Sequence, residues 1–378
     1  IAEDGWLEVE ISEKGKDSYI KKIGIERLHM EEDAGKLVHA GSDRLDGSKY
    51  SLVDYNRAGI ALVEIVSKPD IRTGREASEY ASEIRRTVRY LGVSDGNMQE
   101  GSLRCDVNIS VRRGPEAPFG TKVEIKNMNS FSAIQKACEY EIKRQIKVYE
   151  EGGEIYQETR LWDESKQKTK SMRLKEGSSD YRYFPDPDLG PIELSKNIIA
   201  LWMEELPELP YKKRHKYVSE FGLSSYDARI LSDEIYMATF FEETVNYGAD
   251  PKIASNWITS DISGYLKANK QDFSEIKMTS QNLAEMISLI SNNTISGKIA
   301  KDILPEIIET NISPKKLVDQ KGLAMISDSS SLEIIVDELI KNHPEEVKAY
   351  KNGKTKLLGF FVGQLMKQTK GKADPKLA

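Results

Sequence analysis

The sequence predicts an α+β fold, with a strand-rich first domain, an all-helical second domain and a small helical tail. Short runs before residue 206 alternate apolar and polar residues, a period of two that is typical of strands with one buried face. Beyond Leu206 this alternation disappears and amphipathic helical patterns take over, with Pro207 and Pro210 at the change. A softer break near 311–322 divides the helical part. We therefore expect domains at 1–206, 207–319 and 320–378.

The strands of the first domain begin close to its start, where 6–11 and 23–28 are strand-like. Further on, 103–111 and 122–126 alternate in the same way, and the segment between them is rich in turn residues. These two strands are expected to pair as a hairpin, which brings the polar side chains of one face together. Those side chains are Arg104, Asp106, Asn108, Lys122, Glu124 and Lys126.

Two helices are expected among these strands. Thr73 and Glu76 form a capping-box pattern before apolar residues at helical spacing, and Gly92 ends the run. A second helix should follow Ser130. Its predicted apolar face is Phe131, Ile134, Cys138, Ile142 and Ile146. Further residues are assigned to the cores, namely Cys105, Trp162, Trp202 and Trp257.

Composition limits the class of protein. The chain has 378 residues, of which 39% are hydrophobic and 31% charged, as in soluble globular proteins. No apolar run approaches the roughly 20 residues of a membrane span, so we expect no membrane partner. The two cysteines suggest a reducing, cytoplasmic setting. The formal net charge of −6 argues against a surface that is basic throughout, although it permits a local basic face.

An acidic cluster follows the strand-like run at 23–28. It contains His29, Glu31, Glu32, Asp33 and Lys36. Carboxylates at the end of a strand suit a hard cation such as Mg²⁺, whereas a solvated acidic turn is the structural alternative. Gly35-Lys36 lacks the upstream glycine and the Ser/Thr of a P-loop, and no G-x-G-x-x-G follows a strand. If ATP is used, a different scaffold must hold it.

The polar face of the predicted hairpin offers the other strong candidate site. Phosphoryl transfer needs carboxylates for metal, cations for phosphate oxygens and amides for positioning, and this face carries all three. Asn127 after the second strand adds a further amide. A sheet face with salt bridges and no catalytic role is the alternative. Arg182, between two tyrosines, is suited to stack on a base or to contact phosphate, or else belongs to a surface loop packed by its aromatics.

The end of the chain has a different charge from the rest. From residue 341 onward there are nine lysines and three acidic residues, a net charge of +6 in a chain of −6. Such an asymmetry favours contact with a phosphate backbone, and a lysine-rich end that only aids solubility is the alternative.

Taken together, these stretches resemble the GatB family, whose members are subunits of the tRNA-dependent amidotransferases that convert Glu-tRNA(Gln) or Asp-tRNA(Asn) into Gln-tRNA or Asn-tRNA. The resemblance covers essentially the whole chain, and the segments match in order and spacing. The segments that carry it are 27–36, 64–67, 100–106, 126–131, 180–185, 351–354 and 359–364.

The resemblance implies a cradle-shaped catalytic domain, a helical domain and a YqeY-like tail. It also implies a ligase that is active only within a complex. ATP, with Mg²⁺, phosphorylates the side-chain carboxylate of the misacylated amino acid, and ammonia then displaces the phosphate. The implied partners are a GatA-type amidase that supplies ammonia, a small GatC-type protein and the misacylated tRNA.

Site residues follow from the same resemblance. Glu32 and Glu124 are expected to be metal ligands, and His29, Arg104 and Lys126 to act with them in catalysis. The residues expected to bind the cofactor are Glu31, Lys36, Asp106, Asn108, Asn127 and Arg182.

The sequence also departs from the family pattern. The family's N-terminal portion, with its E-x-H metal residues and cysteine zinc site, is absent, as is the extreme C-terminal end. We therefore expect an incomplete cradle and no zinc. Two other functions remain open at this point, a tRNA-binding adaptor without chemistry of its own and a purely structural subunit.

Overall fold

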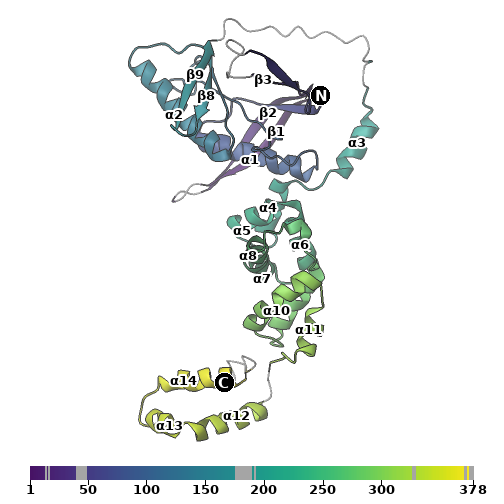
Figure 1. Cartoon of the computed structure of the whole chain (residues 1–378), viewed down its shortest axis with the longest axis vertical. Coiled ribbons are helices and arrows are strands. Elements are labelled where there is room, and N and C mark those ends of the chain that lie inside the picture. The colour runs from purple at the N-terminus through teal and green to yellow at the C-terminus, as the bar shows by residue number, and fades with distance from the viewer. Residues whose placement is uncertain are drawn as a thin grey trace. The chain divides into compact units, whose positions relative to one another are not determined.

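The chain divides into two compact units, Ile1–Pro207 and Glu208–Ala378. The computed structural model describes residues 1–12, 15, 18–39, 49–174, 190, 193–325, 329–369 and 373. The first unit is rich in strands and the second is helical (Figure 1), so the predicted α+β class is confirmed. The further division of the helical part at residue 320 remains a prediction.

One sheet of the first unit contains β1 (Ala2–Ile11), β2 (Tyr19–Glu32) and β5 (Ala61–Ser67), antiparallel in the order β1-β2-β5. Leu7, Val9 and Ile11 alternate into its core, as the pattern at 6–11 predicted. The strand predicted at 23–28 runs on to Glu32, because β5 continues to pair with it. His29, Glu31 and Glu32 therefore lie within the strand, and the expectation that they follow it was wrong, whereas Asp33 comes directly after it as expected.

The described part of this unit has two further sheets. β3 (Lys36–His39) pairs with β4 (Ser51–Asp54). The second large sheet has the order β6-β7-β8-β9, with bounds Val107–Ile109, Val123–Lys126, Glu158–Asp163 and Lys168–Leu174. β6 and β7 form the predicted antiparallel hairpin, whereas β7 and β8 are parallel. β6 is much shorter than the predicted 103–111, since only 107–109 find partners in β7.

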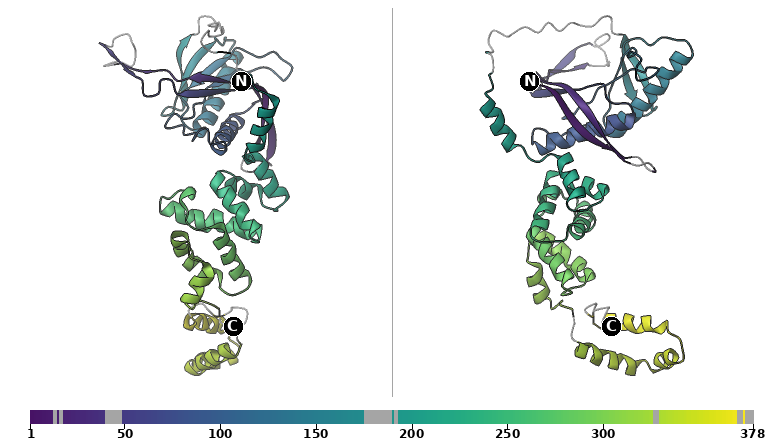
Figure 2. Two further views of the ribbon diagram at one scale, coloured as in Figure 1. Left: turned by 90° about the vertical axis from the view of Figure 1, so that its right-hand side faces the viewer. Right: turned by 180° about the vertical axis from the view of Figure 1, so that it is seen from behind.

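α1 (Gly74–Tyr90) and α2 (Phe131–Glu150) lie side by side and cover the strands (Figure 1; Figure 2 shows the same arrangement from two other sides). The Thr73 hydroxyl caps α1, as predicted, and α2 follows Ser130 as expected, with the Ser130 hydroxyl as its cap. The capping box at α1 is only half present, because the Glu76 carboxylate accepts from the Arg72 amide instead of the Thr73 amide.

α1 belongs to both cores of the first unit. Its residues Ala77 and Ala81 pack with α2 and the β6–β9 sheet, whereas Ile84 packs with β1 and β2. This shared helix holds the two sheets together.

The buried face of α2 differs from the prediction. Ile134 and Cys138 are buried as expected, but Ile146 is 43% exposed. Glu141 and Gln145 are fully buried in its place. The apolar pattern missed them because polar residues can be buried where buried partners satisfy them.

The second unit is built from short helices around one large core, which includes Tyr217, Phe241, Trp257 and Ile303. Its helices up to residue 320 are α4 (Pro210–Ser219), α5 (Ser225–Leu231), α6 (Ile235–Asn246), α7 (Pro251–Asn256), a π-helix (Trp257–Ile262), α8 (Ser263–Ala268), a 3₁₀ turn (Phe273–Glu275), α9 (Ser280–Ser291), α10 (Gly297–Thr310) and α11 (Pro314–Gln320). A separate small core joins α12 (Ser329–Asn342) and α14 (Leu357–Gln368), with α13 (Pro344–Lys351) between them in the chain.

Of the three tryptophans assigned to cores, Trp162 and Trp257 are buried, as predicted. Trp202 is 48% exposed on α3 (Lys196–Glu205), a helix without a buried residue, so that assignment was wrong. Within the described ranges, no helix combines the length and the apolar character that crossing a membrane requires.

Candidate functional site

The first polar cluster lies across β2 and β5. His29 stands opposite Glu64 in the antiparallel register. Its Nε2 atom lies 3.0 Å from Glu31 Oε1 and 3.2 Å from Glu64 Oε2. Among the described residues, these three form the one group of three or more acidic, histidine or cysteine ligands within 4.8 Å of one another. We call them the β2–β5 cluster.

Glu32, a predicted metal ligand, is exposed at the end of β2 and does not belong to this group. Side chains alternate along a strand, so Glu31 and Glu32 point to opposite faces. The sequence indicated both Glu31 and Glu32 as candidates, but only the strand geometry shows that they point to different faces.

The second polar feature is centred on Asp33, the residue after β2. Its Oδ2 atom lies 3.0 Å from Arg57 Nε and 3.3 Å from Arg104 Nη2. Arg57 also donates to the Gly101 carbonyl at 3.3 Å. Gly101 has φ = 81°, a left-handed conformation that favours glycine. Because the Asp33 side chain is only 12% exposed, it is a well-shielded anchor for two guanidinium groups.

The third feature is the open face of the β6–β7 hairpin. Lys126 Nζ lies 2.8 Å from Asp106 Oδ2 and 3.6 Å from Glu124 Oε1. Glu124 also accepts from the Thr159 hydroxyl on β8 at 2.8 Å. Burial alone lowers the pKa of Lys126, but hydrogen bonds to Asp106 and the charges of both carboxylates outweigh it and raise the pKa. The ammonium group therefore stays charged in this setting.

The remaining predicted residues do not belong to the three features described above. Asn108 is exposed opposite Glu124, and Lys122 is exposed just before β7. Asn127 is left-handed, with φ = 71°, and its amide donates to the Trp162 carbonyl at 3.2 Å, which ties the end of β7 to β8. Lys36 is in β3, but its side chain lies outside the described part of the chain, as does the whole of Arg182.

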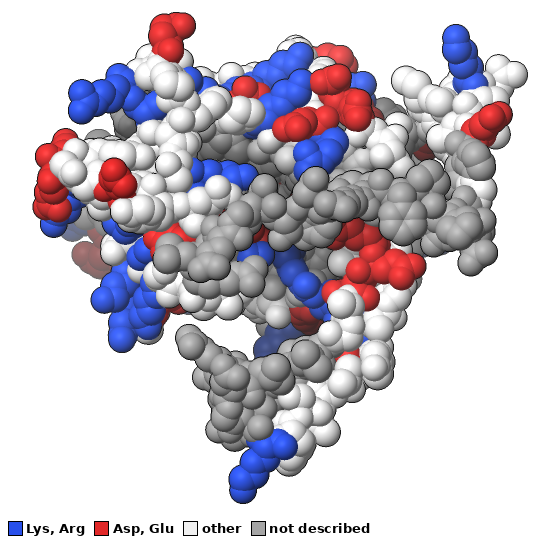
Figure 3. Space-filling model, turned by 90° about the horizontal axis from the view of Figure 1, so that it is seen from above, with Lys and Arg blue, Asp and Glu red and all other residues white. Residues whose placement is uncertain are grey.

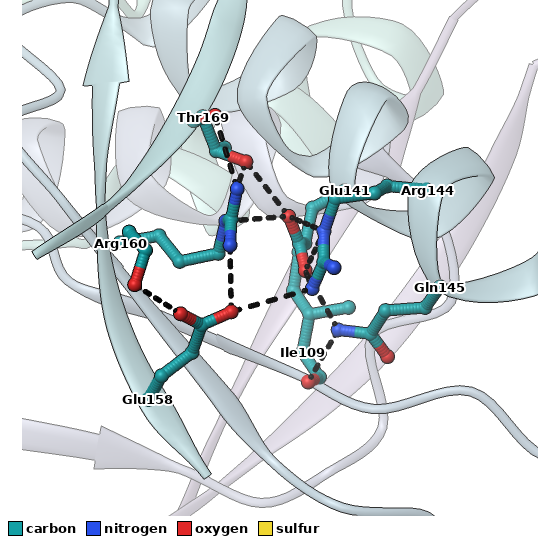
Figure 4. Close-up of polar contacts among 8 residues, drawn as sticks. Ile109, Glu141, Arg144, Gln145, Glu158, Arg160 and Thr169 are labelled. Carbon is teal, nitrogen blue, oxygen red and sulfur yellow. Dashed lines mark hydrogen bonds and ion pairs between the residues drawn. The ribbon is translucent and has the colours of Figure 1, made fainter. Parts of the chain in front are cut away.

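Buried charges fill the other side of the β6–β9 sheet (Figure 4). Glu141 accepts from Arg144, Gln145 and Thr169, while Arg160 pairs with Glu158 at 2.6 Å. The Gln145 amide also reaches the Ile109 carbonyl on β6. Burial raises the pKa of Glu158, but its bonds to Ser171 and Arg160 outweigh burial and lower it below its ordinary value. This network fixes α2 against β6, β8 and β9.

Three contacts between distant segments are not apparent from the sequence. The sequence places Asp33 in an acidic cluster, without the two arginines that it anchors, and does not single out Thr159 as a partner of Glu124. All three contacts join segments far apart in the chain. Acidic and basic side chains lie beside one another on the face of the molecule seen in Figure 3.

A set of carboxylates, arginines and lysine on one compact unit can bind a divalent cation and neutralise phosphate oxygens. The two cysteines take no part. Burial raises the pKa of both Cys105 and Cys138 to about 12, so neither is a thiolate at neutral pH.

Comparison with known proteins gives matches over most of the chain. A family model described as the GatB/GatE catalytic domain matches residues 1–200, and one described as the GatB domain matches residues 239–378. Two relatives from Prochlorococcus marinus, strains CCMP1986 and AS9601, are 81% identical over 378 residues, which is 100% of this chain and 77% of each relative. A relative from Synechococcus sp. strain WH7803 is 72% identical over the same length and is covered to 76%. All three are described as the B subunit of an aspartyl/glutamyl-tRNA(Asn/Gln) amidotransferase.

Proposed function

The chain belongs to the GatB family of tRNA-dependent amidotransferase subunits, and from this we propose that it activates the side-chain carboxylate of misacylated Glu-tRNA(Gln) or Asp-tRNA(Asn) with ATP. A carboxylate oxygen of the substrate attacks the γ-phosphorus and ADP leaves. Ammonia then attacks the carbonyl carbon of the acyl phosphate, and inorganic phosphate leaves as the amide forms and a proton is released. The chain acts as the ligase component of a complex, in which a GatA-type amidase supplies ammonia and a small GatC-type protein joins the two.

The observation that carries this proposal is the ion pair between Arg104 and Asp33, residues 71 positions apart in the chain. Asp33 follows the strand that bears His29, Glu31 and Glu32. Arg104 precedes Asp106 and the hairpin face that bears Glu124 and Lys126. The pair therefore supports one site, to which β2 and the hairpin both contribute.

Each group has a role that its chemistry suits. Arg57 and Arg104 present planar guanidinium groups that match phosphate oxygens, and Lys126 adds a point charge. Together they neutralise charge while two anionic reactants approach each other. His29 orients the Glu31 and Glu64 carboxylates by sharing its Nε2 atom between them.

The acidic side chains also fit Mg²⁺, which prefers oxygen ligands and keeps several waters. Glu32 is exposed and Glu124 Oε1 lies on the Lys126 side of the hairpin, and we infer that these two carboxylates are the donors. Glu31 and Glu64 form a separate carboxylate pair with His29 across β2 and β5. The bound cation would neutralise phosphate charge as the phosphoryl group is transferred. Asp106 and Asn108 flank the same face and would position the nucleotide.

The test compares Arg104→Gln with Arg113→Gln in the full-length complex. Arg113 is exposed in the turn between the hairpin strands and serves as the control. ATP consumption and amide formation are measured with misacylated tRNA and Mg²⁺ present. Arg104→Gln should lower both rates by about 100-fold, whereas Arg113→Gln should leave them unchanged.

Wild-type rates from Arg104→Gln would contradict a site at this ion pair. If the wild-type complex formed amide only after a different protein had activated the substrate with ATP, this chain would instead be a tRNA-binding adaptor.

A further inference from the structure

The Glu124 carboxylate has two differently placed oxygen atoms. Oε2 accepts a hydrogen bond from the Thr159 hydroxyl at 2.8 Å, and Oε1 lies 3.6 Å from Lys126 Nζ. Thr159 stands directly opposite Glu124 in the parallel ladder between β7 and β8. Thr159 is 3% exposed, whereas the Glu124 side chain is 17% exposed. The buried hydroxyl therefore holds one oxygen of Glu124, while the other faces Lys126.

We propose that Thr159 is a positioning residue for the phosphoryl-transfer reaction, and that its hydroxyl fixes the Glu124 carboxylate so that Oε1 is presented to a divalent cation. This inference rests on the proposed function, in which Glu124 is a metal ligand. It assigns a role to a residue on a strand that carries none of the predicted site residues.

The backbone around Thr159 is suited to this role because its neighbours are held on the opposite side of the sheet. Arg160 bonds to Glu158 and to Thr169, and the Glu141 carboxylate completes the network (Figure 4). The register of β8 shifts between Thr159 and Arg160, an irregularity that re-aims side chains locally. Thr159 thus lies in β8, and the buried ion pairs fix the position of this strand.

The hydroxyl acts on Glu124 in two ways. A donor to a carboxylate stabilises the anion, which is the form that binds a hard cation. It also restricts the rotation of the carboxylate, so that less conformational freedom is lost when a cation binds. Loss of such a hydrogen-bond partner of a metal ligand typically weakens metal affinity by about 10–100-fold.

The experiment measures Mn²⁺ binding to the full-length complex by electron paramagnetic resonance, without ATP or tRNA. Two matched pairs isolate the hydroxyl. Wild type and Thr159→Val differ in the hydroxyl at nearly constant shape, and Thr159→Ser and Thr159→Ala differ in it after the methyl group is removed. Thr169→Val is the control, because Thr169 is equally buried but its hydroxyl bonds to Glu141 in the core network. Glu124→Gln tests the ligand itself.

Glu124→Gln should lose one Mn²⁺ site. The Val and Ala variants should bind Mn²⁺ there about 10-fold or more weakly, whereas the Ser variant should stay within about 3-fold of wild type. Thr169→Val should lower the melting temperature without changing Mn²⁺ affinity.

Three other outcomes would overturn the inference. If Glu124→Gln loses the site but Thr159→Val and Thr159→Ala bind like wild type, Thr159 has no positioning role and the proposed function stands. If Thr169→Val weakens Mn²⁺ binding as much as Thr159→Val, the effect is a general loosening of the sheet. If Glu124→Gln binds Mn²⁺ like wild type, the proposed metal role of Glu124 fails as well.

Discussion

At the scale of single residues, the end of β2 offers a direct test of the metal assignment. Glu32 is exposed and contributes nothing to a core, so Glu32→Gln should leave the melting temperature unchanged. It removes an anionic ligand, and we expect ATP-dependent phosphorylation by the full-length complex to be abolished while tRNA binding persists. Phosphorylation at the wild-type rate would show that Glu32 is not a ligand. Glu31, on the other face of the same strand, would then be the next residue to test.

Gly101 offers a second test at this scale. An added Cβ would strain its left-handed backbone and would lie 2.9 Å from Arg57 Nη1, displacing that side chain from Asp33. Gly101→Ala should therefore cost about 1–2 kcal/mol of unfolding free energy and also lower activity. Gly92 is the matched control, because it has φ = 66° with no atom within 4 Å of an added Cβ.

Gly92→Ala should show a similar loss in urea unfolding but full activity in amide formation. Equal activities for the two alanine variants would mean that the Arg57–Asp33 contact has no part in the reaction.

Residue types were predicted better than residue contacts. The sequence indicated that Asp106, Glu124 and Lys126 share a face, because a period of two determines which side chains point together. It did not indicate that Asp33 anchors Arg104, since that contact joins segments 71 residues apart and has no local pattern. Trp202 shows the opposite failure. Its size suggested a core, but nothing in the described part of its helix is buried.

At the scale of secondary-structure elements, the buried ion pairs between α2, β8 and β9 predict how stability changes with pH. Burial raises the pKa of Glu158, but hydrogen bonds from Ser171 and Arg160 outweigh burial, so the pKa lies below its ordinary value of 4.5. A carboxyl group with a lowered pKa in the folded state contributes stability above pH 4.5, and that contribution is lost as pH falls through the folded-state value.

The melting temperature of the first unit should therefore decline as pH falls below about 4.5. Glu158→Gln should be less stable than wild type at pH 7 and should show less of this decline. Glu116→Gln, at an exposed position in the turn between β6 and β7, should change neither value. A decline of the same size in the Glu158→Gln variant would mean that other carboxyl groups cause it.

Helix α13 accounts for some of the charged residues of the tail. Lys348 and Lys351 lie in the last turn of α13, and Glu345 and Glu346 lie in its first turn. This arrangement complements the helix dipole and needs no partner to explain it. Lys354 and Lys356 lie between α13 and α14 and are exposed. For these two lysines the helix dipole offers no such explanation.

At the scale of the whole molecule, the basic tail predicts salt-dependent tRNA affinity. Replacing Lys351, Lys354 and Lys356 with alanine should weaken binding of tRNA to the full-length complex. It should also flatten the plot of log K against log salt by about one unit for each lost phosphate contact. Replacing the same three residues with arginine should preserve the slope, because phosphate accepts either cation. If wild type and the alanine variant gave parallel plots and equal tRNA affinities, the lysines of the tail would serve only solubility.

The order of the units was predictable from the sequence, because alternating and helical apolar patterns occupy separate parts of the chain. The lengths of β2 and β6 were not, since the extent of a strand depends on the partner that pairs with it. β5 extends β2 through the acidic residues, and the short β7 limits β6 to 107–109. The polar face of α2 was not predictable either, because Glu141 also accepts from Thr169 on β9 and Gln145 donates to the Ile109 carbonyl on β6, contacts that join distant parts of the chain.

The position of α1 in two cores has a consequence for how the first unit opens. If α1 detaches, both cores lose its side chains, with Val9 and Ile23 exposed in one and Ile125 and Ile134 in the other. One sheet therefore cannot lose α1 while the other sheet keeps it. The most protected amides of β1–β2 and of β6–β7 should therefore exchange with solvent deuterium through one shared event, at the same free energy. Val9→Ala should accelerate exchange in the distant hairpin as much as in its own sheet. Two separate protection levels, with only β1–β2 responding to the substitution, would show that the sheets open independently.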